Sequence, residues 1–238
     1  MSQTFKALQR AEKERGDVRS APPIKVDDAP EARPDALGIT LPSSLVVERA
    51  IEFDQELKKQ FRGNSVSLLI TAIADVECAA RRTMESGAVW VSELGRKVLL
   101  IDAAFSKPIL HRLCGVPLSG GLSDVGQTED ARIHQLKVVG TSRFLHLMTT
   151  GTSGNPAVDP DRIDYLGEWI SRTGAGYDRT IVFAGDLNGY RSVGSLTNWL
   201  DGVVPIFPLQ TPPGKMKRII SRMESSGAKI AGLVTLEV

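Results

Sequence analysis

From Ser65 onward, short apolar runs alternate with helical stretches, and this alternation strongly limits how the chain can fold. Residues 66–71 form a nearly continuous apolar run, as expected for a strand that is covered on both faces. Residues 74–94 then repeat apolar side chains at the spacing of one helical face, and residues 97–101 are a second apolar run. Strands that alternate with helices form βαβ units, so the sequence predicts an α/β fold with a mainly parallel sheet flanked by helices.

Three more segments are strand candidates: 144–149, 180–184 and 230–236. Between the first two, Asp159 has the side chain of a helix N-cap, and Pro160 stands at the first helical position. Residues 203–207 also resemble a strand, but they include Pro205, which has no N–H to donate in a central ladder. This proline predicts an edge, bulged or shortened strand.

The length of 238 residues suits one α/β domain of ordinary size with an appendage. Near the start, Phe5, Leu8 and Ala11 recur at helical spacing among charged residues, and Gly16 ends this predicted helix. The frequent prolines that follow are typical of an extended linker. The predicted parts are an N-terminal helix at 1–16, a proline-containing linker at 17–43, and an α/β domain at 44–238 whose first helix covers 44–61.

The charge balance and the apolar runs exclude several classes of protein. Lysine and arginine number 29 against 28 aspartates and glutamates, so the net charge is +1, whereas a dedicated nucleic-acid binder usually has a basic excess. The longest apolar stretch, residues 68–74, is too short to span a bilayer, and the charged N-terminus lacks the apolar core of a signal peptide. We therefore expect a cytoplasmic protein that does not insert into a membrane and reaches one only through a partner.

The cysteines and histidines give no sign of a metal site. Cys78 and Cys114 have neither metal-like nor Cys-x-x-Cys spacing, so we expect buried small apolar side chains rather than a disulfide or a zinc site. His111, His134 and His146 are scattered as well, which predicts packing or surface roles.

Four pieces of the sequence resemble one known family. The longest, residues 94–125 (LGRKVLLIDAAFSKPILHRLCGVPLSGGLSDV), contains a strand ending in Ile-Asp, a Pro-x-Leu-His-Arg helix and a Gly-Leu-Ser-Asp turn. The others are GTSGNP at 151–156, Tyr-Asp at 177–178 before a strand, and Gly-Ala-Lys-Ile at 227–230. Residues 46–238 thereby resemble the cytoplasmic domains of bacterial tyrosine autokinases of capsule and exopolysaccharide synthesis, relatives of MinD/ParA-type P-loop ATPases. The opening residues are similar to an N-terminal helix found in a subset of these kinases.

The resemblance implies a P-loop after the first buried strand. Such a loop needs glycines so that backbone N–H groups face the phosphates, a lysine beside the β- and γ-phosphates, and a Ser/Thr hydroxyl on Mg²⁺. The family's Gly-x-Gly-Lys-Ser/Thr falls near residues 76–80, where this chain has Val76, Glu77, Cys78, Ala79 and Ala80. Both glycines, the lysine and the hydroxyl are therefore missing. The acids Asp75 and Glu77 would in addition repel a triphosphate.

The resemblance also implies three acidic positions, of which one is kept. The family's Ile-Asp-Ala-Asp motif is Ile-Asp-Ala-Ala at 101–104, so Asp102 remains and Ala104 replaces the second acid. Phe183 stands where a third acid, a magnesium ligand, would align. Asp102 is then either a relic metal ligand or the cap of a neighbouring helix, and we favour the cap. The autokinases also end in a tyrosine-rich tail, whereas no tyrosine follows Tyr190.

These losses predict a pseudokinase: a non-catalytic component or regulator of bacterial capsule, exopolysaccharide or holdfast polysaccharide synthesis and export, without a cofactor or metal. The expected partner is an inner-membrane chain-length regulator, a polysaccharide copolymerase, which would hold the cytoplasmic protein at the inner membrane. Phe5, Leu8 and Ala11 would form the docking face. Self-association stays open, although residues 48–54 do not reproduce the Glu-x-x-Arg-x-x-Arg pattern through which active relatives oligomerise.

The alternative is an active ATP-dependent tyrosine autokinase, or a MinD-like ATPase, with an atypical P-loop. Ala79 argues against it, because the loss of one charge-assisted phosphate contact removes several kcal/mol of transition-state stabilisation. A membrane-bound positioning protein of the MinD type would need a terminal amphipathic basic helix, whereas residues 227–238 predict a strand.

Overall fold

The structure is a computed structural model that describes residues 25–26, 39, 41–156 and 159–237. Its strands are β1 (Lys25–Val26), β2 (Val66–Ala72), β3 (Val98–Asp102), β4 (Arg132–Lys137), β5 (Phe144–Met148), β6 (Arg179–Asp186), β7 (Gly202–Pro208) and β8 (Val234–Leu236). Its α-helices are α2 (Ser44–Gln60), α3 (Val76–Ser92), α4 (Leu110–Cys114), α5 (Pro160–Gly174), α6 (Leu187–Val193) and α7 (Pro213–Ser225). Two 3-10 helices are η2 (Leu122–Asp124) and η4 (Gly194–Trp199).

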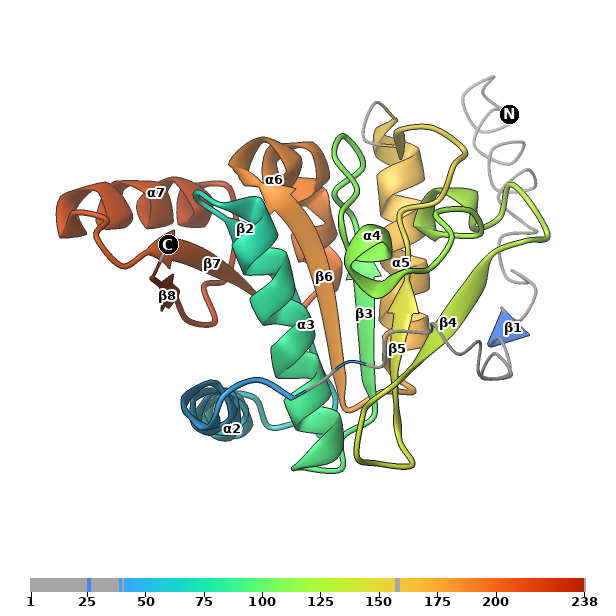
Figure 1. Ribbon diagram of the computed structural model, residues 1–238. Helices are drawn as coiled ribbons and strands as arrows, with labels where there is room; N and C mark the ends of the chain where they lie inside the picture. The colour runs from blue at the N-terminus through green and yellow to red at the C-terminus, as the bar shows by residue number, and fades with distance from the viewer. Residues whose placement is uncertain (1–24, 27–38, 40, 157–158, 238) are drawn as a thin grey trace, which may run out of the picture.

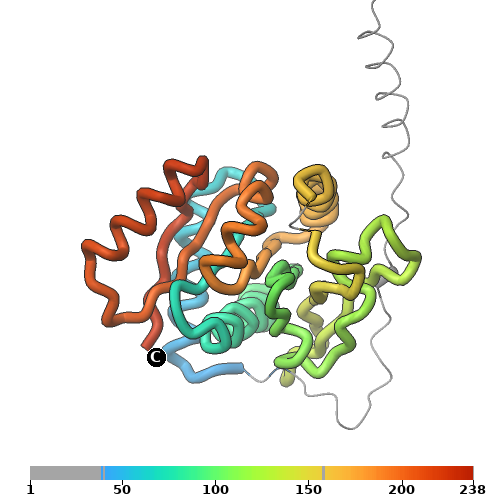
Figure 2. Tube along the Cα trace, turned by 90° about the horizontal axis from the view of Figure 1, so that it is seen from above, coloured from blue at the N-terminus to red at the C-terminus, as the bar shows by residue number. Residues whose placement is uncertain are grey.

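The strands form one sheet of 8 in the order β1-β4-β5-β3-β6-β2-β7-β8 (Figure 1). Every pair of neighbours is parallel except β4 and β5, which run antiparallel. Helices α2, α3 and α4 cover one face of the sheet, and α5, α6 and α7 cover the other (Figures 1 and 2). The predicted α/β fold with a mainly parallel sheet is therefore confirmed.

Each face of the sheet has its own apolar core, because the central strands carry apolar side chains on both faces. Successive residues of a strand point to opposite faces. Leu68 accordingly packs in the cluster that contains Trp90 of α3, and its neighbour Leu69 packs in the cluster that contains Trp169 of α5. This double burial explains why the strands appear in the sequence as continuous apolar runs.

Most of the predicted elements are confirmed to within about two residues, the usual uncertainty of helix and strand ends. They are α2, β2, β3, β5, α5 and β6, and α3 also follows its prediction closely. The predicted cap of α5 is present, since Oδ1 of Asp159 accepts the N–H of Asp161 at 3.1 Å and of Arg162 at 3.3 Å. Pro160 is the first residue of that helix.

The strand that contains Pro205 differs from its prediction. β7 is a strand of 7 residues between β2 and β8, so it is neither an edge strand nor a shortened one. Alternate residues of a parallel strand point their N–H groups to the same side, and Val203 donates its N–H to the Lys229 oxygen on the β8 side. Pro205 lies two residues after Val203, so its nitrogen also faces the β8 side. At this point β7 and β8 are not paired, and their pairing begins between Ile206 and Val234.

Both edges of the sheet also depart from the sequence analysis. The antiparallel strand β4 was not predicted, and β1 pairs with it in parallel. Ile39 is buried and donates its N–H to the Lys137 oxygen at 3.1 Å. Two described parts of the predicted linker at 17–43 therefore contact the sheet. At the other edge, β8 occupies only the last 3 residues of the predicted strand at 230–236.

The predicted N-terminal helix at 1–16, with Phe5, Leu8 and Ala11, lies outside the described residues. Its docking role therefore stays a prediction. Within the part of the chain that the structure describes, no helix is both long and apolar enough to cross a membrane.

A buried ion cluster fixes α2 to the amino end of the sheet. The fully buried carboxylate of Asp54 accepts hydrogen bonds from Nε of Arg179 at 2.8 Å and from Nη2 of Arg96 at 3.0 Å. Lys58 approaches the same carboxylate, with Nζ 3.5 Å from Oδ2. Arg179 is the first residue of β6, and Arg96 lies just ahead of β3. One carboxylate thereby joins a helix to the starts of two strands.

Candidate functional site

The carboxyl ends of β2, β3 and β6 lie side by side in the middle of the sheet, and Figure 2 looks down on this edge. Ligands of open α/β sheets bind in the crevice outside the carboxyl ends of the strands. The sequence resemblance places the P-loop and its acids at this edge as well. Three segments build it: residues 73–75 between β2 and α3, residues 103–109 between β3 and α4, and the last two residues of β6, Gly185 and Asp186, directly before α6.

Helix α3 begins earlier than a P-loop would allow. Residues 76–80 all lie in the first turns of α3, whereas a P-loop keeps its glycine-rich residues ahead of the helix. Oδ1 of Asp75 accepts the N–H of Cys78 at 2.9 Å, and the backbone oxygen of Asp75 accepts the N–H of Ala79 at 3.1 Å. These two N–H groups are thus bonded within the chain, and a carboxylate occupies the N-terminus of the helix.

The side chains of this first turn differ in exposure. Ala79, at the position of the family's lysine, is 1% exposed, and Ala80 is fully buried. Both pack in the apolar core between α3 and the sheet. Val76 and Cys78 are half-buried. A lysine at position 79 would therefore start within the core rather than at the mouth of a loop.

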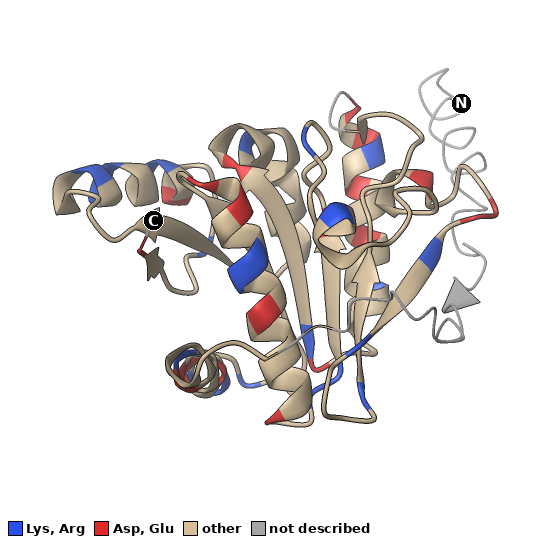
Figure 3. Ribbon diagram, viewed as in Figure 1, with Lys and Arg blue, Asp and Glu red and all other residues tan. Residues whose placement is uncertain are grey.

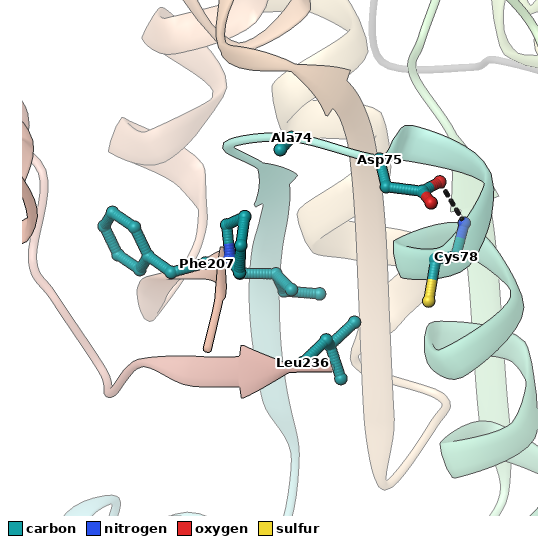
Figure 4. A pocket seen from close by; sticks show the side chains of 7 residues that line it. Ala74, Asp75, Cys78, Phe207 and Leu236 are labelled. Carbon is teal, nitrogen blue, oxygen red and sulfur yellow. Dashed lines mark hydrogen bonds between the residues drawn. The ribbon is translucent and has the colours of Figure 1, made fainter. Parts of the chain in front are cut away.

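Cys78 lines a small cavity between the start of α3 and the last two strands (Figure 4). Its volume is about 10 Å³, which is space for one water molecule. The lining residues are Ala74, Asp75, Cys78, Ile206, Phe207, Pro208 and Leu236. The prediction that Cys78 is buried is therefore wrong, because it stands at the first turn of the helix beside this opening. Cys114 is buried as predicted, and burial raises the pKa of its thiol to about 12.

Asp102, the last residue of β3, is fully buried, and its carboxylate accepts three backbone N–H groups. Its Oδ1 accepts the N–H of Ala104 at 3.0 Å, and its Oδ2 accepts the N–H groups of Ile109 at 3.0 Å and Leu110 at 2.9 Å. Burial raises the pKa of Asp102, while the three N–H donors act in the opposite direction. The carboxylate thereby folds residues 103–109 back on the strand and caps α4.

The two positions where the family has further acids are filled by packed side chains. Ala104 is 3% exposed, and a Cβ added to Gly185 would lie 3.0 Å from its Cβ, so the loop after β3 contacts the end of β6 closely. Phe183 is fully buried in the core under α3. Asp186, the carboxylate nearest to Phe183 in the sequence, caps α6 by accepting the N–H of Gly189 at 2.8 Å.

A fourth acid, which the sequence analysis did not single out, holds the GTSGNP loop. Asp124 ends the Gly-Leu-Ser-Asp turn, and its carboxylate accepts N–H groups from Gly121 at 2.9 Å, Thr152 at 3.0 Å and Ser153 at 2.7 Å. Burial acts to raise its pKa, but a hydrogen bond from the Ser153 hydroxyl and those from the three N–H groups outweigh it, so the pKa of Asp124 is lowered. A Cβ at Gly121 would collide with the backbone of Thr149, so the turn requires glycine there. The Gly-Leu-Ser-Asp turn, which the chain shares with the family that it resembles, was the one sequence feature that pointed to this contact.

None of the three tyrosines is exposed. Tyr177 and Tyr190 are buried, and Tyr165 is half-buried with its ring 5.1 Å from the guanidinium carbon of Arg162. The hydroxyl of Tyr177 lies 2.7 Å from Nδ1 of His146, and burial raises the pKa of this tyrosine to about 12. His146 therefore has the packing role that its spacing predicts.

No family model matches the chain, and the curated proteins contain no match to it. Among solved structures, the chimerical protein CapA2B2 is similar, with 17% identity over 85% of this chain and 94% of the other, and a TM-score of 0.64. The VpsO kinase domain has 15% identity, with coverages of 82% and 95% and a TM-score of 0.63. The kinase domain of the Escherichia coli tyrosine kinase ETK has 18% identity, with coverages of 81% and 75% and a TM-score of 0.61. The chain therefore has the fold of bacterial tyrosine kinase domains.

Proposed function

We propose that this protein is a non-catalytic member of the tyrosine-kinase fold, a pseudokinase that acts in bacterial capsule, exopolysaccharide or holdfast polysaccharide synthesis and export. The observation that carries the proposal is the start of α3. There the N–H groups of Cys78 and Ala79 are already bonded to Asp75, and the carboxylate of Asp75 stands where phosphates would need positive charge.

The other groups around the site support the same conclusion. A magnesium nucleotide requires a cation beside its phosphates and carboxylate oxygens that are free to hold the metal. Ala79 supplies no cation, and Asp102 uses both of its oxygens on backbone N–H groups. Phe183 is part of the core. These residues do not fit a magnesium nucleotide, so we assign no catalytic step to the site.

The proposed partner is an inner-membrane chain-length regulator, and the proposed site of action is the cytoplasmic side of that membrane. Support for both comes from the sequence resemblance to autokinases of polysaccharide synthesis, together with the kinase-like fold. The N-terminal segment with Phe5, Leu8 and Ala11 would dock on the regulator as an amphipathic helix. An isolated helix of this length is marginal in water, so its apolar face would become ordered mainly on a partner.

Calorimetric titration of the full chain with millimolar Mg·ATP and Mg·ADP tests the central claim. We expect no saturable heat, whereas the ETK kinase domain in the same buffer provides the positive control. A micromolar dissociation constant for this chain would overturn the pseudokinase proposal and favour the alternative of an atypical P-loop enzyme.

Mass spectrometry of phosphotyrosine tests the same claim by a second route. The protein is expressed without other kinases and incubated with Mg·ATP. We expect no phosphotyrosine, because no tyrosine is exposed and no group fits the magnesium nucleotide. Phosphate mapped to Tyr165, the most accessible of the three, would contradict the proposal.

A further inference from the structure

Helix α7 carries an unusual concentration of positive charge at one edge of the sheet. Its 13 residues include four basic side chains and one acid, Glu224. The basic residues are Lys215, Lys217, Arg218 and Arg222, and all four are exposed. Figure 3 shows this charge as a run of blue segments along α7. The chain as a whole has a net charge of +1, so the helix is a local departure from a balanced surface.

Helices α2 and α3 neutralise their cations, and α7 does not. Every lysine and arginine of α2 and α3 pairs with a carboxylate of its own helix. These pairs are Arg49 with Glu52, Lys58 with Asp54, Lys59 with Glu56, Arg81 with Glu77 and Arg82 with Glu85. Among the described residues, no carboxylate forms an ion pair with any of the four cations of α7. These cations therefore remain available to an external anion.

The helical repeat arranges these charges in a row. Lys215, Arg218 and Arg222 follow one another at i, i+3 and i+7, so they lie along one side of the helix. Met223 is 2% exposed, and Ile219 packs with it in the core under α7, so the apolar face is turned toward the sheet. The cations flank this face, and all four are exposed.

We infer that α7 binds the anionic phospholipid headgroups of a membrane, with the helix lying on the surface rather than inserted. A row of unpaired cations complements a flat anionic layer along its whole length. This inference does not depend on the proposed function. It departs from the expectation that the protein reaches a membrane only through a partner.

Vesicle co-sedimentation of the full chain tests the inference. One set of vesicles contains phosphatidylcholine alone, and the other contains phosphatidylcholine and phosphatidylglycerol in equal amounts. We expect binding only to the anionic vesicles, with a loss of binding as salt is raised, because surface charges are screened over about 10 Å at 0.1 M salt. The double variant Arg218→Gln with Arg222→Gln should lower the partition coefficient about 25-fold, since each cation near such a surface contributes a factor of about five.

A matched control removes the same net charge elsewhere. Arg49→Gln with Arg81→Gln changes two exposed arginines of α2 and α3, and its binding to anionic vesicles should equal that of the unchanged chain. Glutamine has nearly the helix propensity of arginine, so both double variants should fold. The single variant Glu224→Gln should strengthen binding. Equal losses in the two double variants, or sedimentation no greater with anionic than with neutral vesicles, would overturn the inference. Binding to duplex DNA through α7 without binding to vesicles would also overturn it.

Discussion

The two ends of the sheet use aspartates in opposite ways. At the amino end, Asp54 joins α2 to β3 and β6 through two arginines that are far away in the sequence. At the carboxyl end, Asp75, Asp102 and Asp186 each accept N–H groups from the helix that follows their own strand. The first arrangement is a long-range ion pair between elements, and the second is a set of local caps. The edge where this fold would hold a ligand is therefore closed by its own backbone hydrogen bonds.

Removal of the amino-end carboxylate should have the largest effect. Asp54→Ala leaves the guanidinium of Arg179 buried without its partner, and the loss of one member of a buried ion pair costs about 3–5 kcal/mol. Urea unfolding should show this decrease in the free energy of unfolding. Glu52→Ala on the same helix is the control, because it breaks only the exposed pair with Arg49, which is worth less than about 1 kcal/mol. Similar losses in the two variants would disprove the long-range clamp.

At the carboxyl end, Asp102→Asn should have a moderate effect. The amide has one acceptor oxygen for three N–H donors, so at least one buried donor loses its partner, at a cost of about 1–3 kcal/mol. Urea unfolding measures the loss. Polysaccharide output of cells complemented with the variant should be nearly unchanged if the protein folds. A normally folded variant with no output would show that Asp102 has a chemical role.

The third prediction concerns pH and Asp124. Because its pKa is lowered in the folded state, this carboxylate stabilises the fold above the ordinary carboxyl pKa of about 4, and the contribution is lost as the pH falls below that value. Asp124→Asn should therefore destabilise the protein by about 1–2 kcal/mol at neutral pH and by progressively less in acid. Chemical unfolding of both proteins across this range measures the difference. A difference that stays constant with pH would be inconsistent with a lowered pKa.

The smallest effect on stability should follow removal of residues 1–16. The sequence predicts no core strand in that segment, so the thermal melt should not change. Recovery of the protein in a pull-down with the cytoplasmic segments of the regulator should fall, since the proposed docking face of Phe5, Leu8 and Ala11 is lost. An unchanged pull-down would reject the docking role. A collapsed melt would show that the arm packs on its own domain.

The difference between local caps and long-range ion pairs also explains which contacts the sequence could predict. The Asp159–Pro160 start of α5 and the capping preference for Asp102 were deduced correctly because donor and acceptor lie within a few residues of each other. Asp54 and Arg179 are 125 positions apart in the sequence, and no local pattern predicts their pairing. The earlier start of α3 is an intermediate case. The helical spacing from residue 74 already placed residues 76–80 in a helix, but only the structure shows that Asp75 caps the start of that helix.

Two edge elements were missed for a related reason. β4 mixes Arg132, His134 and Gln135 with apolar residues, as a strand near the rim of a sheet does, so it lacks the continuous apolar run of β2 or β3. α7 buries little besides Met223, and its many charges resemble those of a loop. Elements at the rim bury fewer side chains, so their sequences contain fewer apolar residues than those of the centre.

The pairing of β1 with β4 shortens the tether of the N-terminal arm. Only residues 17–24 separate the arm from Lys25, and 8 residues span at most about 29 Å when fully extended. A partner bound through the proposed docking face would therefore be held close to the β4 rim, at a high effective concentration there. α7 lies at the opposite rim of the sheet. If both contacts form, the protein would behave as a bivalent ligand whose two attachment points fix its rotation relative to the membrane.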